Sequence, residues 1–140
     1  MRDYFYLIIG VVGGIISEFL GGWDTALNTL AFLMAADIIT GWIVAAVFHN
    51  SQKTESGKLE SRVGWKGLCR KGATFLVIMI AYRLDLMAGT TFLKDAVIIA
   101  FTANEALSVI ENVGLMGVPI PKVIMDAIDV LKNKSEEGVK

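Results

Sequence analysis

The sequence has very few of the residue types from which catalytic and metal-binding sites are built. It contains one histidine, His49, and one cysteine, Cys69, with no further ligands at a spacing that would hold a metal ion. No Ser-His-Asp combination is evident, and Glu105 and Glu111, which are six residues apart, project in different directions and so form no obvious acid/base pair. The glycines of GVVGGI lie inside an apolar run, without the strand–turn–helix context of a phosphate loop. We therefore expect no enzyme activity, no catalytic residues, no metal and no cofactor.

Charged residues are also scarce, whereas hydrophobic residues are abundant. Charged residues make up 19% of the chain and hydrophobic residues 54%, and the mean hydropathy is +0.59. Ordinary globular chains carry about 25% charged residues. A soluble domain of this size buries only about two thirds of the surface that its chain exposes, which is too little to hide so much apolar surface. Insertion into a membrane removes this difficulty.

The hydrophobic residues are concentrated in four segments. These segments are residues 4–20, 26–48, 73–87 and 92–113. A helix needs roughly 20 apolar residues to cross a bilayer, and only the third segment is doubtful, because Arg83 and Asp85 interrupt it. The amphipathic spacing after the two prolines predicts a further short helix up to Leu131. We predict an all-α integral membrane protein with about four transmembrane helices, an amphipathic C-terminal helix within residues 1–131, and a charged tail over residues 132–140.

The positive charges are unevenly distributed and predict the orientation in the membrane. We assign six basic residues to the long loop between the second and third segments: Lys53, Lys58, Arg62, Lys66, Arg70 and Lys71. Basic loops stay on the cytoplasmic side, so four crossings would place both termini in the cytoplasm of a bacterial cell as well. These basic residues are not interleaved with stacking aromatic side chains, apart from Trp65, so we expect no nucleic-acid partner.

Small and charged residues within the apolar segments indicate where helices meet. The first segment has small residues on one face, at Gly10, Gly13, Gly14, Ser17 and Gly21. Such a face lets helices approach closely, either within one subunit or between subunits of an oligomer. Polar residues expected within the membrane are Glu18, Asp37, Arg83 and Asp85. Each should face protein or water; Asp37 either joins two helices or serves a pore, and Arg83 either reaches outward or pairs with a carboxylate.

The fourth segment carries a polar stripe, which is the most informative feature of the sequence. At about 100° per residue, five polar side chains fall within an arc of about 120°. They are Asn104, Glu105, Ser108, Glu111 and Asn112. A polar stripe on a membrane helix must be satisfied by a partner helix or by water. It therefore predicts a surface that becomes wetted when several copies assemble, although Glu111 and Asn112 are equally consistent with a solvated helix end.

Three stretches of the sequence resemble a known family. They are DIITGW (residues 37–42), ESRVGWKGLCRKG (residues 60–72) and NEALSVIENVGLMGVPIPKVI (residues 104–124). The last is similar to the NE-x-x-SI-x-EN motif, followed by glycine and two prolines, of the toxin-secretion/phage-lysis holins of Gram-positive bacteria and their phages. Gly117, Pro119 and Pro121 occupy the final positions of this motif, and Val109 stands where isoleucine is usual. The resemblance covers about residues 5–131.

The resemblance implies a small protein of the bacterial cytoplasmic membrane that forms homo-oligomers and opens a lesion. Its functional partner would be a cell-wall hydrolase or a toxin that leaves the cell through the lesion. Two other functions fit the pattern of segments. A small proton-coupled exporter would use Glu18 as its intramembrane carboxylate. A membrane adaptor would recruit a soluble partner through its basic loop and tail without changing permeability.

Overall fold

The computed structural model describes residues 1–139, which fold into helices joined by short connections and one longer loop. The helices are α1 (Arg2–Phe19), α2 (Thr25–Ala46), α3 (Ser61–Ala88), α4 (Phe92–Leu115) and α5 (Lys122–Val139). No strand is present in this part of the chain. The all-α fold class is therefore confirmed. Two of these helices, α2 and α4, are long and apolar enough to cross a membrane.

Local sequence signals explain where the helices begin and end. The Asp24 side chain accepts a hydrogen bond from the Leu27 backbone N–H at 2.9 Å and so caps the start of α2. Gly89 ends α3 in the left-handed conformation, with φ at 68°, which glycine adopts without a steric penalty. Gly117, also at positive φ, follows α4, and Pro119 lies in the connection to α5. These signals set the lengths of the three helices that form the centre of the molecule.

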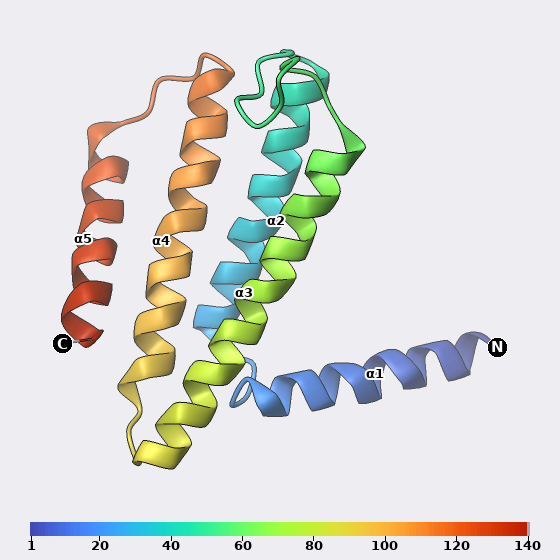
Figure 1. The fold of residues 1–140 in the computed structure, drawn as a ribbon, viewed down its shortest axis with the longest axis vertical. Helices are drawn as coiled ribbons and strands as arrows, with labels where there is room; N and C mark the ends of the chain where they lie inside the picture. The colour runs from blue at the N-terminus through green and yellow to red at the C-terminus, as the bar shows by residue number, and fades with distance from the viewer. Residues whose placement is uncertain (140) are drawn as a thin grey trace.

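Helices α2 to α5 lie alongside one another, and successive helices run in opposite directions (Figure 1). Helix α4 is central, because it packs against α2, α3 and α5. Helices α2 and α3 touch each other very little and are held at a distance over the half of α3 nearest the loop of residues 47–60. The apolar core lies toward the other end of the bundle, where these side chains are buried: Leu20, Leu27, Leu30, Met34, Ile78 and Ile98.

Helix α1 leaves the bundle at a large angle and does not pack along it (Figure 1). None of its residues is buried, and its apolar side chains, from Tyr4 to Phe19, are mostly exposed. The turn after α1 is nevertheless tightly fitted. A Cβ atom added to Gly21, whose φ is 79°, would lie 2.7 Å from Cε2 of Tyr82 in α3. Any larger residue at this position would both strain the backbone and displace the tyrosine ring.

Most of the small-residue face of α1 has no partner among residues 1–139. A Cβ atom added to Gly10, Gly13 or Gly14 would meet no other atom within 4 Å. Of the remaining two residues of the face, Ser17 is half-buried, and Gly21 contacts the Tyr82 ring. The sequence left two options open for this face, packing within one subunit or packing between subunits. Among the described residues, Gly10, Gly13 and Gly14 do not pack within the subunit.

Two boundaries differ from those that the sequence predicts. Helix α3 begins at Ser61, so the loop is shorter than expected, and four of the six basic residues assigned to it lie on the helix: Arg62, Lys66, Arg70 and Lys71. Helix formation there was obscured by Gly64, Gly67 and Gly72, which lower helix propensity. Helix α5 continues beyond Leu131 to Val139 and packs on α4, where the Ser135 hydroxyl donates to the Ala96 carbonyl at 3.1 Å.

Candidate functional site: an ionic network between three helices

One charged side chain from each of α2, α3 and α4 meets at the centre of the bundle. The Lys71 ammonium group of α3 donates to Oδ2 of Asp37 on α2 at 2.7 Å and to Oε2 of Glu105 on α4 at 2.5 Å. The side chains of Lys71 and Glu105 are each 14% exposed, and that of Asp37 is 7% exposed. We call this set the ionic network, and it joins α3 to the two apolar helices.

An amide and a hydroxyl group complete the ionic network on the side of α2. The Asn112 side chain of α4 donates from Nδ2 to Oδ1 of Asp37 at 3.0 Å and to Oγ1 of Thr40 at 3.0 Å. The Thr40 hydroxyl in turn donates to the Ala36 carbonyl at 2.7 Å. Throughout the described residues, every buried side-chain nitrogen or oxygen has a hydrogen-bond partner. The carboxylate of Asp37 is therefore held by both a cation and an amide, as a buried charge requires.

The ionic network lies close to the middle of both apolar helices. Asp37 is the thirteenth of the 22 residues of α2, and Glu105 is the fourteenth of the 24 residues of α4. A single charge at the centre of a membrane helix costs about 2.5–3.5 kcal/mol on insertion scales. Pairing offsets much of that cost, because the opposite charges and their hydrogen bonds replace hydration. The arrangement allows α2, α3 and α4 to share one hydrophobic environment while they retain three ionisable groups.

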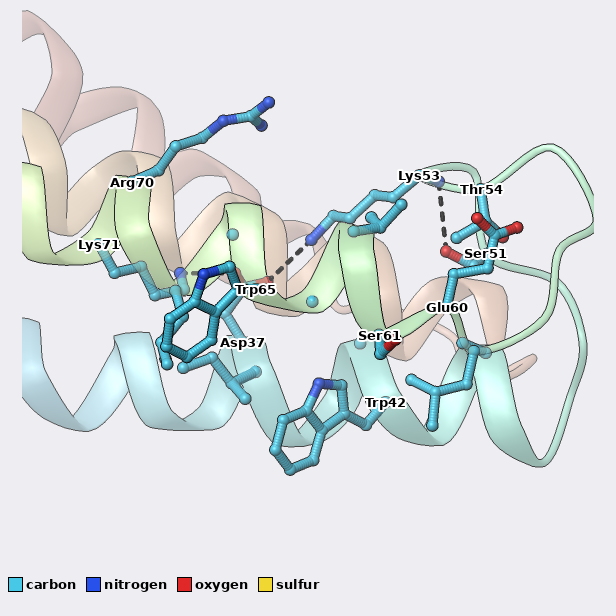
Figure 2. A pocket seen from close by; sticks show the side chains of 18 of the residues that line it. Asp37, Trp42, Ser51, Lys53, Thr54, Glu60, Ser61, Trp65, Arg70 and Lys71 are labelled. Atoms are coloured by element: carbon cyan, nitrogen blue, oxygen red, sulfur yellow. Dashed lines mark hydrogen bonds and ion pairs between the residues drawn. The ribbon is translucent and has the colours of Figure 1, made fainter.

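A second lysine approaches the same carboxylate from the loop of residues 47–60. The Nζ atom of Lys53 lies 3.7 Å from Oδ1 of Asp37, and its side chain is 56% exposed (Figure 2). With Lys53 the site holds two positive and two negative charges, so it is formally neutral. Because Lys53 is solvated and its contact is long, it contributes less than the buried Lys71 pair.

The structure divides the polar stripe that the sequence predicts on α4. Glu105 and Asn112 turn toward α2 and α3 and belong to the ionic network. Asn104 and Glu111 are exposed, and Ser108 is half-buried between these two groups. The stripe is thus continuous on α4, but only part of it faces outward in the single chain. The sequence left two roles open for Asp37, joining helices or serving a pore. In the single chain its carboxylate joins helices, because it contacts Asn112 of α4 and Lys71 of α3.

Asp85 serves the start of α4 and lies apart from the ionic network. Its Oδ2 atom accepts a hydrogen bond from the Lys94 backbone N–H at 2.8 Å, and its Oδ1 atom accepts from the Leu93 N–H at 3.1 Å and the Thr90 hydroxyl at 2.6 Å. Thr91, at the N-cap position of α4, makes no side-chain capping bond. A residue of α3 therefore caps α4 in its place and fixes the hairpin between these two helices.

Replacing Asp85 by alanine should lower the free energy of unfolding by about 1–2 kcal/mol, because two backbone N–H groups at the start of α4 lose their acceptor. The measurement is loss of helicity during denaturant unfolding of the purified protein in detergent micelles. Asp95→Ala is the matched control, because Asp95 also lies in the first turn of α4 but is exposed. Equal destabilisation by the two substitutions would show that Asp85 acts only through its charge near the helix end.

The remaining charged residues expected in the membrane are at the surface. Arg83 on α3 and Glu18 on α1 are both exposed, and neither takes part in an ion pair among the described residues. The cation that pairs with Asp37 and Glu105 is Lys71, which the sequence predicts to lie in the loop. Its signal was present in the sequence, because Gly64, Gly67, Lys71 and Ile78 share one helical face.

These features define a class of protein: a small, all-helical membrane protein in which Asp37, Lys71 and Glu105 pair between three helices. Comparison with known proteins gives the family. The chain belongs to the bacteriophage holin family, whose model matches residues 14–133. The match includes the helices that supply the ionic network and most of α5. No solved structure matches the chain.

Relatives of similar length occur in Gram-positive bacteria and in a phage. A probable holin of Bacillus phage phi105 is 35% identical over 124 residues, which cover 88% of this chain and 86% of the relative. A protein of Listeria monocytogenes is 32% identical over 126 residues, covering 89% of this chain and 84% of the relative. A 14.9 kDa protein encoded in the nagH 3′ region of Clostridium perfringens is 31% identical over 133 residues, which cover 92% of this chain and 95% of the relative.

Proposed function

We propose that this protein is a holin that oligomerises in the cytoplasmic membrane and opens a lesion through which a cell-wall hydrolase or a toxin leaves the cell. The observation that carries the proposal is the ionic network inside a chain of the holin family. A chain whose mid-helix charges on α2 and α4 are paired internally can accumulate in a bilayer without exposing those two charges to lipid. The same polar groups become available to water when the helices separate during assembly.

In the proposed lesion, the polar stripe of α4 lines or seals the aqueous opening. Its five residues are Asn104, Glu105, Ser108, Glu111 and Asn112. Asn104 and Glu111 are already exposed, and they would be the first to face a neighbouring subunit or water. Release of Glu105 and Asn112 from Lys71 and Asp37 would complete the wetted surface. Opening is then an exchange of internal hydrogen bonds for bonds to water and to neighbouring copies.

Assembly would use helix α1 as a contact between subunits. The glycines Gly10, Gly13 and Gly14 form an open small-residue face, and the exposed apolar side chains of α1 need lipid or another protein around them. We propose that α1 is the first of four crossings and that the loop of residues 47–60 and both termini are cytoplasmic. The basic residues of the loop and of the start of α3 support this orientation.

Helix α5 would supply a second water-facing surface. Its exposed charged residues are Lys122, Asp126, Asp129, Lys134, Glu136 and Glu137. Placed against lipid at the depth of α4, each would cost on the order of 2–3 kcal/mol, so the docked helix needs water on its outer side. We propose that α5 lies on the cytoplasmic membrane surface in the unassembled chain and docks on α4 when assembly brings water to its outer side, before the ionic network opens.

The deciding experiment is inducible expression in a bacterium, with and without a cytoplasmic cell-wall hydrolase, while membrane potential and culture turbidity are followed. A holin gives an abrupt loss of potential after a delay, and lysis only in the cells that contain the hydrolase. A proton-coupled exporter would instead give transport that depends on a pH gradient and on Glu18. An adaptor would recruit a soluble partner while the potential stays intact. Either of these last two results would overturn the proposal.

A further inference from the structure

A buried lysine at the start of α4 takes no part in the ionic network. Lys94 is the third residue of α4, and only 10% of its side chain is exposed. The first turn of a helix carries a partial positive charge, so a lysine is unfavourable there, and its burial adds a desolvation cost. Its ionic contact is weak, because Nζ lies 4.0 Å from Oδ2 of Asp24, whose side chain is 51% exposed. Other contacts must therefore hold this side chain in place.

The ring of Tyr82 on α3 supplies the second contact. The Nζ atom of Lys94 lies over this ring, 5.4 Å from its centroid, which is within the range of a cation–π interaction. The same ring fits closely against Gly21, in the connection from α1 to α2. Asp24 belongs to that connection as well and caps the start of α2. We call these four residues the turn clamp: Gly21, Asp24, Tyr82 and Lys94.

Helix α1 has few other contacts that could fix its direction. None of its residues is buried, and it packs appreciably only against α3. Its C-terminal end is rigid, because the Gly21 N–H donates to the Glu18 carbonyl at 3.0 Å and the Gly22 N–H donates to the Ser17 carbonyl at 2.8 Å. Leu20 anchors this end in the core. One anchored point leaves the angle of a helix free, whereas a second contact, of Gly21 with the Tyr82 ring, restricts it.

We propose that the turn clamp fixes the angle at which α1 leaves the bundle, with Lys94 as the positioning residue that keeps the Tyr82 ring against Gly21. The fixed angle holds the small-residue face of α1 away from its own bundle, where a second copy of the chain can reach it (Figure 1). A helix that is already held in place loses less conformational freedom when two copies associate. This consequence for assembly rests on the proposed function, whereas the fixed angle is a property of the single chain.

The angle of α1 can be measured by electron–electron distance spectroscopy on the protein in nanodiscs that hold one copy each. Spin labels are attached at Leu7→Cys on α1 and Leu76→Cys on α3, both exposed positions, after the exposed native cysteine is removed by Cys69→Ser. The parent protein should give one narrow distance distribution. Lys94→Met should give a clearly wider distribution or a second distance. A distribution that stays narrow in Lys94→Met, with helicity intact, would overturn the proposal.

Three further variants separate the turn clamp from a general loss of stability. Lys94→Arg keeps a cation over the ring and should keep the narrow distribution. Lys122→Met removes an exposed lysine at the start of α5 and should also keep it. Tyr82→Leu should widen the distribution as Lys94→Met does, and it replaces that variant in the test if Lys94→Met does not fold. Equal widening by Lys94→Arg or Lys122→Met would overturn the proposal.

The consequence for assembly is tested by the onset of lysis in cells that also contain the hydrolase, with protein amounts matched. Lys94→Met should delay the onset relative to the parent protein, and Lys94→Arg should restore it. A wider distance distribution with an unchanged onset would overturn the role of the turn clamp in assembly. If the parent protein itself leaves the membrane potential intact, the proposed function fails, whereas the distance measurement still decides whether the turn clamp fixes α1.

Discussion

Replacing Lys71 by methionine should destabilise the bundle by about 3–5 kcal/mol, which is the largest effect we expect from any single substitution. The side chain is the only buried cation between Asp37 and Glu105 in the described structure, and it is 14% exposed. Without it, two carboxylates remain close together in an apolar surrounding with no positive partner except the solvated Lys53. Removing one partner of a buried ion pair costs far more than the pair itself contributes.

The free energy of unfolding in detergent micelles, followed by loss of helicity, measures this effect. Lys66→Met is the matched control, because Lys66 lies on the same helix but is exposed, and it should change stability by less than about 0.5 kcal/mol. Adding Asp37→Asn and Glu105→Gln to Lys71→Met should recover most of the loss, because no unpaired charge is then left. A triple variant as unstable as Lys71→Met would show that the loss comes from packing of the lysine stem.

The helical fold could be predicted from the sequence because its signals are local. The apolar runs of α2 and α4, the Asp24 cap and the two prolines after α4 each act within a few residues. The positions of α1 and α5 relative to the bundle could not be predicted in this way. They depend on contacts between distant segments, such as Gly21 with Tyr82 and Ser135 with Ala96.

The ionic network was predicted in part, and the missing part has a specific cause. The sequence shows Asp37 and Glu105 as carboxylates that need a partner, and it suggests Arg83 as one candidate. The structure instead uses Lys71, which precedes the apolar run that begins at Ala73 and was therefore assigned to the loop. The helical face on which Lys71, Ile78 and Asp85 recur every seven residues extends through this boundary, and it would have shown that both charges point inward.

The second large effect concerns the timing of lysis and follows from Glu105, which is the ionic contact between α3 and α4 within the network. Glu105→Leu removes the acceptor and should weaken the closed form by about 2–5 kcal/mol. Shifting a two-state equilibrium by 2 kcal/mol changes the ratio of its states by about thirtyfold. If separation of these helices precedes lesion opening, lysis should start much earlier than in the parent protein. Glu105→Gln keeps a neutral acceptor for the hydrogen bond from Lys71. Lysis with this variant should therefore begin later than with Glu105→Leu and earlier than with the parent protein.

Turbidity after induction, in cells that also contain the hydrolase, gives the order of onset for the two variants, with protein amounts matched by immunoblot. Glu111→Leu is the control, because Glu111 lies on the same polar stripe but is exposed and outside the network. An unchanged onset for both Glu105 variants would rule out the network as the contact that holds the closed form. Equal acceleration by Glu111→Leu would instead assign the effect to the added hydrophobic side chain on α4. Acceleration confined to Glu105 would link the stability of the closed chain to the delay before lysis, because both then depend on the same ion pair.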